Sequence, residues 1–430
     1  MIKKYLVVGG GFAGLSAAVY LARNSFQVDL IESSPKLGGR AYSFLEKSTD
    51  TLIDNGQHIL MGCYTDTLNF LKIIDADQNL AYQNNLEVNF LKKDFKEITL
   101  KSEGFLYPFN LILGLLKFEV LKFSERLTLL SLLLKLPFIS SQKLFNLSVY
   151  DWLIKENQNE NIRKCFWDVI AIGALNTSTK KASAKVFVNV LKKIFLKGNF
   201  ASTIILPGKG LSETYCDNAV EFITKRGSKI FFSEAVEEII IENNSIKSIR
   251  SSKNTYNDYD YFIFAVPHYS LMRIFKDESI VSSINFEYST IVNLHIWLKK
   301  NELEKPFYGL IDSQVYWGFN KGTHLNLVIS DANYLVEKTN EEIFEIAAVE
   351  LKKYLRIERE MITEFIVIKE KRATFIPSKE VVDNRPSQKT KIKNLVLAGD
   401  WVDTALPSTI ESAVKSGRIA AEIELGKLNL

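Results

Sequence analysis

The chain has 430 residues, more than one compact domain usually holds, so we expect two intertwined domains. Hydrophobic residues make up 47% and charged residues 24%, which is typical of a globular protein. The 54 basic and 50 acidic residues give a net charge of +4, too balanced to indicate a nucleic-acid partner.

The first forty residues have the pattern of a βαβ unit. Residues 5–8 form a short apolar run, expected as a buried strand because it is too short for the core of a signal peptide. A glycine turn at 9–14, an Ala-rich helix at 15–24 and a second strand at 27–31 follow. From about residue 65 to 200 the pattern becomes mostly helical, with long segments at 111–135 and 149–172. This region predicts a separate helical layer or lid.

A second α/β passage begins near residue 208, with a helix at 208–225 and strands at 229–232, 236–242 and 259–266. Further on, we expect strands at 291–299, 324–330 and 365–370 and an amphipathic helix at 341–354. Together these predict a substrate domain that contains a sheet. The chain ends with a strand at 394–397 and a helix at 408–425, which we expect to dock on the first domain.

The glycine turn is a G-x-G-x-x-G motif, formed by Gly9, Gly11 and Gly14 directly after a strand and before a helix. These glycines permit a tight turn, close approach of a pyrophosphate and close helix packing, and the helix N-terminus attracts the phosphates. Glu32, which follows the second strand, is positioned to accept a hydrogen bond from a ribose hydroxyl. The alternative is a glycine-rich turn without a ligand. The βαβ context favours a dinucleotide site.

Gly38, Gly39 and Arg40 follow Glu32 and distinguish FAD from NAD. A glycine pair lets the chain lie close to the cofactor, and a guanidinium neutralises a diphosphate in a planar, bidentate way. These residues look like a second flavin fingerprint, and the alternative is a solvent-exposed turn with a surface arginine.

The C-terminal stretch Leu397-Ala398-Gly399-Asp400-Trp401, followed by Pro407, Thr409, Glu411 and Gly417, resembles the FAD-dependent amine oxidase and carotenoid-desaturase superfamily. The resemblance implies that Asp400 bonds the ribityl chain, that the following helix faces the flavin ring, and that Val236 contacts the adenine, although a valine in a strand is usually core. The residues expected to bind FAD are Gly9, Gly11, Phe12, Ala13, Gly14, Glu32, Gly38, Gly39, Arg40, Val236, Gly399, Asp400, Thr409 and Ile410.

Within this superfamily, the chain resembles the squalene-associated FAD-dependent desaturases, or hydroxysqualene dehydroxylases, of hopanoid biosynthesis, along its whole length. The motifs that carry this narrower resemblance are Asp54-Asn55-Gly56-Gln57-His58, Ala174-Leu175-Asn176-Thr177 and Arg372-Ala373-Thr374-Phe375. Ser178 departs from the family, which tends to have Pro there.

The resemblance implies an α/β fold in which a Rossmann-like FAD-binding domain of the glutathione reductase type carries an inserted mixed α+β substrate domain and a helical membrane-facing part. We expect residues 1–75, 201–270 and 391–430 to form the discontinuous FAD-binding domain. Residues 76–200 and 271–390 are expected to form the substrate domain.

The resemblance also implies that reduced flavin delivers hydride to an allylic carbon as a hydroxyl group leaves, which converts hydroxysqualene into squalene. One acid must protonate the leaving hydroxyl. The candidates are Asp54, His58 and Glu411, each of which has a structural alternative: capping a turn, filling a core position or positioning a helix. His268, His295 and His324 are scattered, so no metal site is expected.

An isoprenoid substrate dissolves in membranes, so we expect a peripheral protein at the inner membrane and an external electron donor that the sequence does not identify. Cys63, Cys165 and Cys216 form no C-x-x-C pair, which fits a reducing, cytoplasmic setting. The apolar segment 105–138 carries too many charges to span a bilayer but suits docking on one. Core helices under the substrate cavity are the equal alternative.

Two other functions remain open from the sequence. One is a carotenoid desaturase of the phytoene type, in which hydride passes from the polyene to the flavin. The other is a prenyl-lipid carrier without flavin, as Rab escort and GDP-dissociation-inhibitor proteins resemble this fold. The intact glycines, Glu32, Arg40 and Asp400 favour an enzyme.

Overall fold

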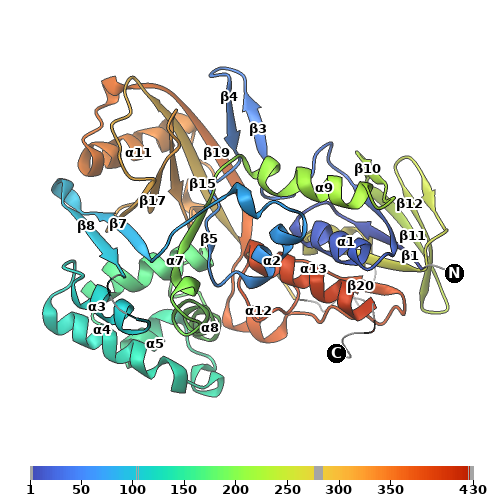
Figure 1. The fold of residues 1–430 in the computed structure, drawn as a ribbon, viewed down its shortest axis with the longest axis horizontal. Coiled ribbons are helices and arrows are strands. Elements are labelled where there is room, and N and C mark those ends of the chain that lie inside the picture. Colours follow the sequence, from blue (N-terminus) through green and yellow to red (C-terminus); the bar gives the residue numbers. More distant parts are fainter. Residues whose placement is uncertain (1–2, 103, 105, 276–283, 425, 427–430) are drawn as a thin grey trace.

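The computed structural model describes residues 3–102, 104, 106–275, 284–424 and 426. Phe105 and Leu425, which end two of the predicted segments, lie outside the described residues. In Figure 1 a parallel sheet with its helices occupies one half of the molecule, and a larger mixed sheet and a group of helices occupy the other.

The first half is built on a five-stranded parallel sheet in the order β10-β2-β1-β14-β20. Alternate residues of β1 point to opposite faces, so Tyr5 and Val7 pack among the helices while Leu6 and Val8 pack toward a small second sheet. Because both faces are covered, these strands are almost continuously apolar. The strands are β1 (Lys4–Val8), β2 (Gln27–Glu32), β10 (Ile230–Phe232), β14 (Tyr261–Phe264) and β20 (Leu395–Leu397).

Helices and a three-stranded sheet cover the two faces of the parallel sheet. The helices are α1 (Phe12–Arg23), α9 (Asp217–Thr224), which continues the π-helical turn Ser212–Cys216, and α13 (Ile410–Glu424). The small sheet consists of β11 (Val236–Glu242), β12 (Ser245–Ser251) and β13 (Thr255–Tyr256).

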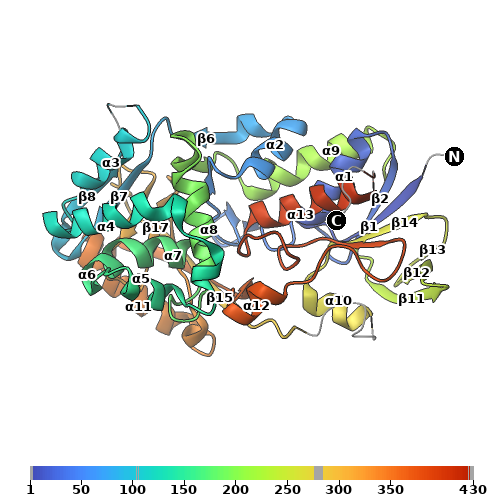
Figure 2. The same cartoon turned by 90° about the horizontal axis from the view of Figure 1, so that it is seen from below.

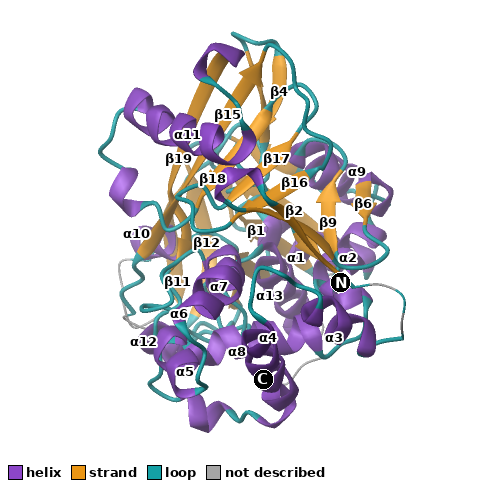
Figure 3. Cartoon of the chain, turned by 90° about the vertical axis from the view of Figure 1, so that its left-hand side faces the viewer, coloured by secondary structure: helices purple, strands orange, loops and turns teal. Residues whose placement is uncertain are grey.

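The second half contains a seven-stranded sheet in the order β19-β15-β18-β17-β16-β7-β8. One of its faces packs on α11 (Asn340–Leu355), and the other packs on helices from the first half of the chain. In Figure 3 the long strands β15 and β19 of this sheet run through the upper part of the view, with α11 beside them. The strands are β7 (Glu87–Leu91), β8 (Glu97–Lys101), β15 (Tyr288–Leu298), β16 (Phe307–Leu310), β17 (Trp317–Asn320), β18 (Leu325–Ile329) and β19 (Ile362–Phe375).

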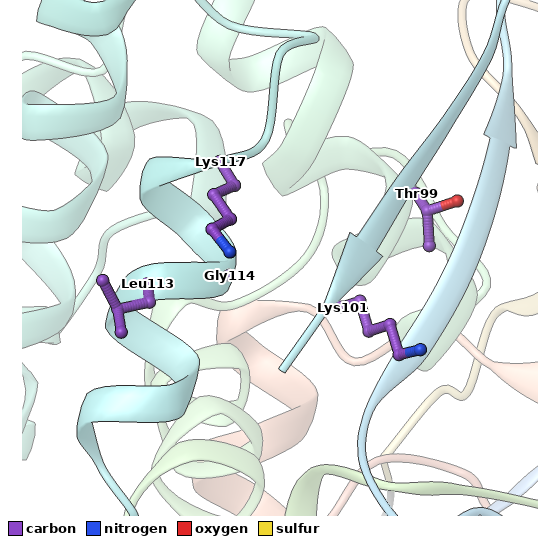
Figure 4. A pocket seen from close by; sticks show the side chains of 5 residues that line it. All are labelled: Thr99, Lys101, Leu113, Gly114 and Lys117. Carbon is purple, nitrogen blue, oxygen red and sulfur yellow. The ribbon is translucent and has the colours of Figure 1, made fainter. Parts of the chain in front are cut away.

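The helical part gathers at the end of the molecule away from the parallel sheet (Figure 2). Helix α3 lies against β8, where a side chain at Gly114 would come within 2.4 Å of the Lys101 carbonyl oxygen. Figure 4 shows the small pocket between these elements, with Lys101 and Lys117 on its wall. The helices are α3 (Phe109–Leu116), α4 (Phe123–Lys135), α5 (Val149–Lys155), α6 (Glu160–Ile162), α7 (Asp168–Leu175) and α8 (Ala184–Phe195).

Shorter elements connect these parts. A hairpin is formed by β3 (Ser43–Glu46) and β4 (Thr51–Asp54), and a small sheet by β5 (Leu60–Met61), β6 (Leu80–Tyr82) and β9 (Ile204–Pro207). The remaining helices are α2 (Thr65–Ile73), α10 (His268–Ile274) and α12 (Lys379–Asn384).

The prediction that residues 65–200 are mostly helical is wrong for residues 80–101, which form β6, β7 and β8. The residues of β8 alternate between exposed and buried, a period-two pattern that a helical reading overlooks. The long segments at 111–135 and 149–172 of the region predicted to be mostly helical each contain more than one helix, and the first is interrupted between α3 and α4. The predicted domain boundaries stay a prediction.

Among the described residues, no helix is long and apolar enough to cross a bilayer.

Candidate functional site

The glycine motif lies where β1 turns into α1. Gly9 has a φ of +106°, which favours glycine, and its N–H donates to the Ile31 carbonyl at 2.8 Å. A side chain at Gly14 would come within 1.9 Å of the Gly9 carbonyl oxygen, so α1 lies tightly on the turn. Phe12 and Ala13 form the buried first turn of α1.

The second glycine pair faces the first. The Gly38 N–H donates to the Gly10 carbonyl at 3.0 Å, and a side chain at Gly39 would come within 3.2 Å of the Gly11 Cα. Side chains would therefore fill the gap between the two turns. No side chain caps the N-terminus of α1, and its first turn has no acidic residue. This arrangement fits a dinucleotide phosphate, which the helix N-terminus and the glycine backbones would hold.

Glu32 and Val236 lie at the other end of this turn. The Glu32 carboxylate accepts hydrogen bonds from the N–H of Gly10 at 2.6 Å and of Ser34 at 2.8 Å. The Glu32 carbonyl accepts from the N–H of Glu234, two residues before Val236 begins β11. Glu32 thus contacts the glycine turn directly, and Val236 follows shortly after a residue that is bonded to Glu32.

Arg40 and Asp400, 360 residues apart in sequence, form an ion pair of 2.6 Å. Arg40 also donates to the Ala373 carbonyl, and Ser408 donates to the second oxygen of Asp400. Burial raises the pKa of the Asp400 carboxyl, but Arg40 and the hydrogen bonds outweigh it and hold the pKa below its ordinary value. Asp400 is therefore ionised.

Arg385, which the sequence analysis missed, organises the loop after Asp400. Its buried guanidinium donates to the carbonyls of Asp400 at 2.6 Å, of Leu406 at 2.5 Å, and of Trp401 and Val402. Burial lowers its pKa to about 10, so the group remains charged at neutral pH. No local sequence signal marks it, because four of its hydrogen-bond acceptors are main-chain oxygens, with the Thr404 hydroxyl as a side-chain acceptor.

Helix α13 returns to α1 as predicted. Gly399 begins the loop with a φ of +148°, and its N–H donates to the Ser416 hydroxyl at 2.8 Å. A side chain at Gly417 would come within 2.2 Å of the Ala13 carbonyl oxygen. Thr409 precedes Ile410, the first residue of the helix, and its hydroxyl accepts from the Ser412 N–H. The two ends of the chain thus form one site.

Glu411 lies on α13 but is turned toward α2. Its two oxygens accept from the N–H groups of Asp66 and Thr67 and from the Thr67 hydroxyl, at 2.8 to 3.1 Å. Burial raises the pKa of this carboxyl. A carboxylate with both oxygens occupied in this way caps the N-terminus of α2. This geometry favours the structural alternative for Glu411, and its role as an acid stays a prediction.

Asp54 and His58 lie on the segment that joins the hairpin to the rest of the site. Asp54 is buried, and its Oδ1 accepts from the Ser43 hydroxyl at 2.7 Å and from the Leu211 N–H at 2.9 Å. Burial lowers the pKa of His58 to about 4, so its imidazole is neutral at pH 7. The Asn55 amide donates to the Arg40 carbonyl at 3.0 Å, which holds the segment beside Arg40.

The structure brings together two histidines that the sequence analysis treated as scattered. His295 on β15 and His324 before β18 are both buried, and their ring nitrogens lie 3.0 Å apart. His295 also lies 3.0 Å from the Asp54 carbonyl oxygen. The antiparallel pairing of β15 and β18 places them together, which their spacing in sequence does not reveal. His268 lies elsewhere, against Phe286.

The middle motifs also converge on this site. Asn176 has a φ of +47° at the end of α7, and its amide donates to the Thr374 hydroxyl at 3.0 Å. The neighbouring Ala373 carbonyl accepts from Arg40, and the Arg372 guanidinium lies over the Tyr269 ring. The motifs around Asp54, Asn176 and Thr374 therefore surround the Arg40–Asp400 pair.

This combination of a parallel sheet, a paired glycine turn and a returning C-terminal helix defines a flavin dinucleotide-binding enzyme fold. Residues 12–423 match the model of the family described as flavin containing amine oxidoreductase. The chain belongs to this family and is an FAD-dependent oxidoreductase.

Proteins of named activity and solved structures are also similar to this chain. A hydroxysqualene dehydroxylase of Zymomonas mobilis is 28% identical, with 97% of this chain and 98% of the relative covered. A 15-cis-phytoene desaturase of Glycine max is 22% identical over 97% of this chain and 78% of the relative. Among solved structures, an oxidoreductase of Methanosarcina mazei has a TM-score of 0.75 at 15% identity, covering 99% of this chain and 100% of that one.

Proposed function

We propose that the protein reductively removes the hydroxyl group of hydroxysqualene to form squalene, a step of isoprenoid and hopanoid biosynthesis. The observation that carries the proposal is the similarity to a hydroxysqualene dehydroxylase along nearly the whole of both chains. The convergence of the three middle motifs beside Arg40 and Asp400 supports it, because these motifs carry the narrower resemblance.

Bound FAD, once reduced, supplies the hydride that replaces the hydroxyl group. The residues of the chain must then hold the cofactor, exclude water and protonate the leaving oxygen. The glycine turns and Arg40 would hold the diphosphate, and Asp400 the ribityl chain. Of the three acid candidates, Asp54 is favoured, since one oxygen is held by two donors and the other is not. Both oxygens of Glu411 are engaged by α2, and His58 is neutral.

The proposal is tested with purified holoprotein, reduced without oxygen and incubated separately with hydroxysqualene and with phytoene. We expect squalene from the first incubation, detected by mass spectrometry, and no change in the second. New double bonds in phytoene, with oxidised flavin as the acceptor, would instead support a desaturase, the activity for which the Glycine max relative is named. A protein that takes up no FAD, and so lacks absorbance bands near about 370 and 450 nm, would be a carrier.

We further propose that the helical part docks on the surface of the inner membrane, from the cytoplasmic side. The segment from Leu106 to Phe138 divides into two sides, since Leu111, Leu115 and Phe118 are buried in the core. The α3–α4 face, defined as its exposed apolar side chains, consists of Leu106, Phe109, Phe123, Leu127, Leu134 and Phe138. Exposed lysines at 117, 122 and 135 flank it, which suits an anionic bilayer.

Docking is measured by sedimentation with phosphatidylglycerol-containing vesicles. Phe109 and Phe138 are 62% and 83% exposed, and burying each in lipid contributes about 1 to 2 kcal/mol after allowing for that exposure. We expect Phe109→Ser with Phe138→Ser to weaken binding by about 30-fold or more. The control is Leu45→Ser with Leu52→Ser on the β3–β4 hairpin, which is also exposed. Equal loss in both variants would refute the assignment to α3 and α4.

A further inference from the structure

A cluster of buried polar groups lies between Asp54 and the inner strands β15 and β18 of the seven-stranded sheet. Its members are the Asp54 carboxylate, the His295 and His324 imidazoles, the Asn326 amide and the Lys321 ammonium group. His295 and Asn326 are each 1% exposed, and His324 is 4% exposed. Burying so many polar groups is costly unless they are paired, so their arrangement requires a reason.

The histidines hold the main chain of Asp54. Because a carbonyl oxygen only accepts, we assign the proton of His295 to Nε2, which lies 3.0 Å from the Asp54 carbonyl; the Asn326 amide, also 3.0 Å from Nε2, then presents its oxygen to it. Its Nδ1 then accepts from Nε2 of His324 at 3.0 Å, and Nδ1 of His324 accepts from the Thr323 hydroxyl at 2.9 Å. Burial lowers the pKa values of His295 and His324 to about 3 and about 4, so this chain is neutral. This chain of hydrogen bonds therefore holds the main chain of Asp54 in place, but it carries no extra proton that it could donate.

The two oxygens of the Asp54 carboxylate have different surroundings. Oδ1 accepts two hydrogen bonds, from the Ser43 hydroxyl and the Leu211 N–H. Oδ2 lies 3.8 Å from Nζ of Lys321, and no closer donor to it is described among the structured residues. Oδ2 is therefore the oxygen that can gain and lose a proton without breaking the hydrogen bonds that hold the side chain.

Lys321 connects this oxygen to the solvent. It lies in the turn between β17 and β18, where its N–H donates to the His324 carbonyl at 2.9 Å. The side chain is 25% exposed, compared with 9% for Asp54. Burial lowers the pKa of the Lys321 amine, and the Asp54 charge opposes this effect. An ammonium group between water and a buried carboxylate, with its affinity for the proton weakened, is suited to pass a proton inward.

We propose that Lys321 is the residue through which Asp54 is supplied with the proton that each turnover consumes; the inference rests on the proposed function. The proton passes from the Lys321 ammonium to Oδ2 of Asp54 once the lysine side chain closes the 3.8 Å separation to hydrogen-bond distance, and from there to the hydroxyl oxygen of the substrate. The C–O bond breaks with its electron pair on oxygen, so water leaves, and bound, reduced FAD would supply the hydride for the new C–H bond. Lys321 regains a proton from solvent, and an external two-electron donor reduces the FAD again.

The first test is chemical rescue of Lys321→Ala. With FAD content equal to that of the unchanged protein, we expect kcat for squalene formation to fall at least tenfold and KM to change little. Small primary amines should restore the rate, and the restored rate should vary with the basicity of the amine, because the missing group transfers a proton. The exposed Lys300, which pairs with Glu302 at 2.6 Å, provides the matched control as Lys300→Ala.

The outcome separates the two proposals. If the unchanged protein forms no squalene, the proposed function fails. If it forms squalene but Lys321→Ala is within twofold of it, or is slow and not restored by amines, the role of Lys321 fails. Lys321→Arg keeps the charge but binds its proton too tightly, so it should be as slow as Lys321→Ala; full activity would mean that the charge alone is required.

The second test does not depend on activity. The lysines are methylated with a ¹³C-labelled reagent, and the Lys321 amine is assigned by its absence from Lys321→Ala and titrated by NMR. We expect it to titrate below the exposed lysines, and still lower in Asp54→Asn, which removes the carboxylate charge. Titration together with the exposed lysines, unaffected by Asp54→Asn, would contradict the coupling.

Discussion

Replacing Asp400 with alanine should release the cofactor, because this carboxylate joins the two ends of the chain. It is 4% exposed and pairs with Arg40 at 2.6 Å, with a second hydrogen bond from Ser408. Hydrogen bonds to a charged group are each worth about 1.5 to 3 kcal/mol. Because the Arg40 side chain is 34% exposed, solvent weakens its interaction with Asp400, and we expect the loss of both hydrogen bonds to cost about 2 to 3 kcal/mol in total.

If all of this free energy is lost from FAD binding, the affinity of the protein for FAD falls about 30- to 140-fold. The assay is titration of the apoprotein with FAD, followed by flavin fluorescence, with a thermal unfolding curve to show that the variant folds. Asp403→Ala, on the same loop but exposed, is the control and should bind FAD like the unchanged protein. Unaltered flavin content in folded Asp400→Ala would refute the role assigned to Asp400.

Three further predictions concern the same site. Gly39→Ala should lower FAD content, because the residue has a φ of +60° and its new side chain would approach Gly11. Gly104→Ala is the control for backbone strain alone, since Gly104 also has a positive φ but has open space around it. Equal flavin loss in both variants would refute the argument that the Gly39 side chain crowds Gly11. Arg385→Met should lower the free energy of unfolding by about 3 kcal/mol in urea denaturation, since four main-chain carbonyls lose their donor, and a change below about 0.5 kcal/mol would contradict this. The free energy of unfolding should also fall as pH drops from about 6.5 toward 4: the pKa values of His58, His295 and His324 are depressed in the folded state, so the unfolded chain binds more protons in that range. His295→Gln should flatten the slope, and an unchanged slope would show that His295 is not buried neutral.

The half of the fold that contains the parallel sheet and the glycine turns could be predicted from the sequence because its signals are local. Gly9, Gly11 and Gly14 stand in a fixed order between a strand and a helix, and the backbone positions that require glycine are visible as glycines. The helix at the C-terminus could be anticipated for the same reason. Its contact with α1 depends on Gly417, a residue already part of the motif.

The residues that the sequence analysis missed interact across long distances in the chain. His295 and His324 meet only because β15 and β18 pair in one register, which no spacing rule specifies. Arg385 binds mostly main-chain oxygens, which every residue carries, so no particular residue type in the sequence indicates its partners. Lys321 lies in an ordinary polar turn, and its position beside Asp54 follows from the approach of the hairpin to the large sheet. The roles of Asp54, His58 and Glu411 remain predictions.

The central claim is tested most directly by a single turnover. Holoprotein is reduced to the two-electron level, freed of reductant and mixed without oxygen with an excess of hydroxysqualene, while flavin absorbance near about 450 nm is followed. We predict that the flavin becomes oxidised in step with squalene, one molecule for each flavin. Flavin that stays reduced while no squalene forms would contradict the account.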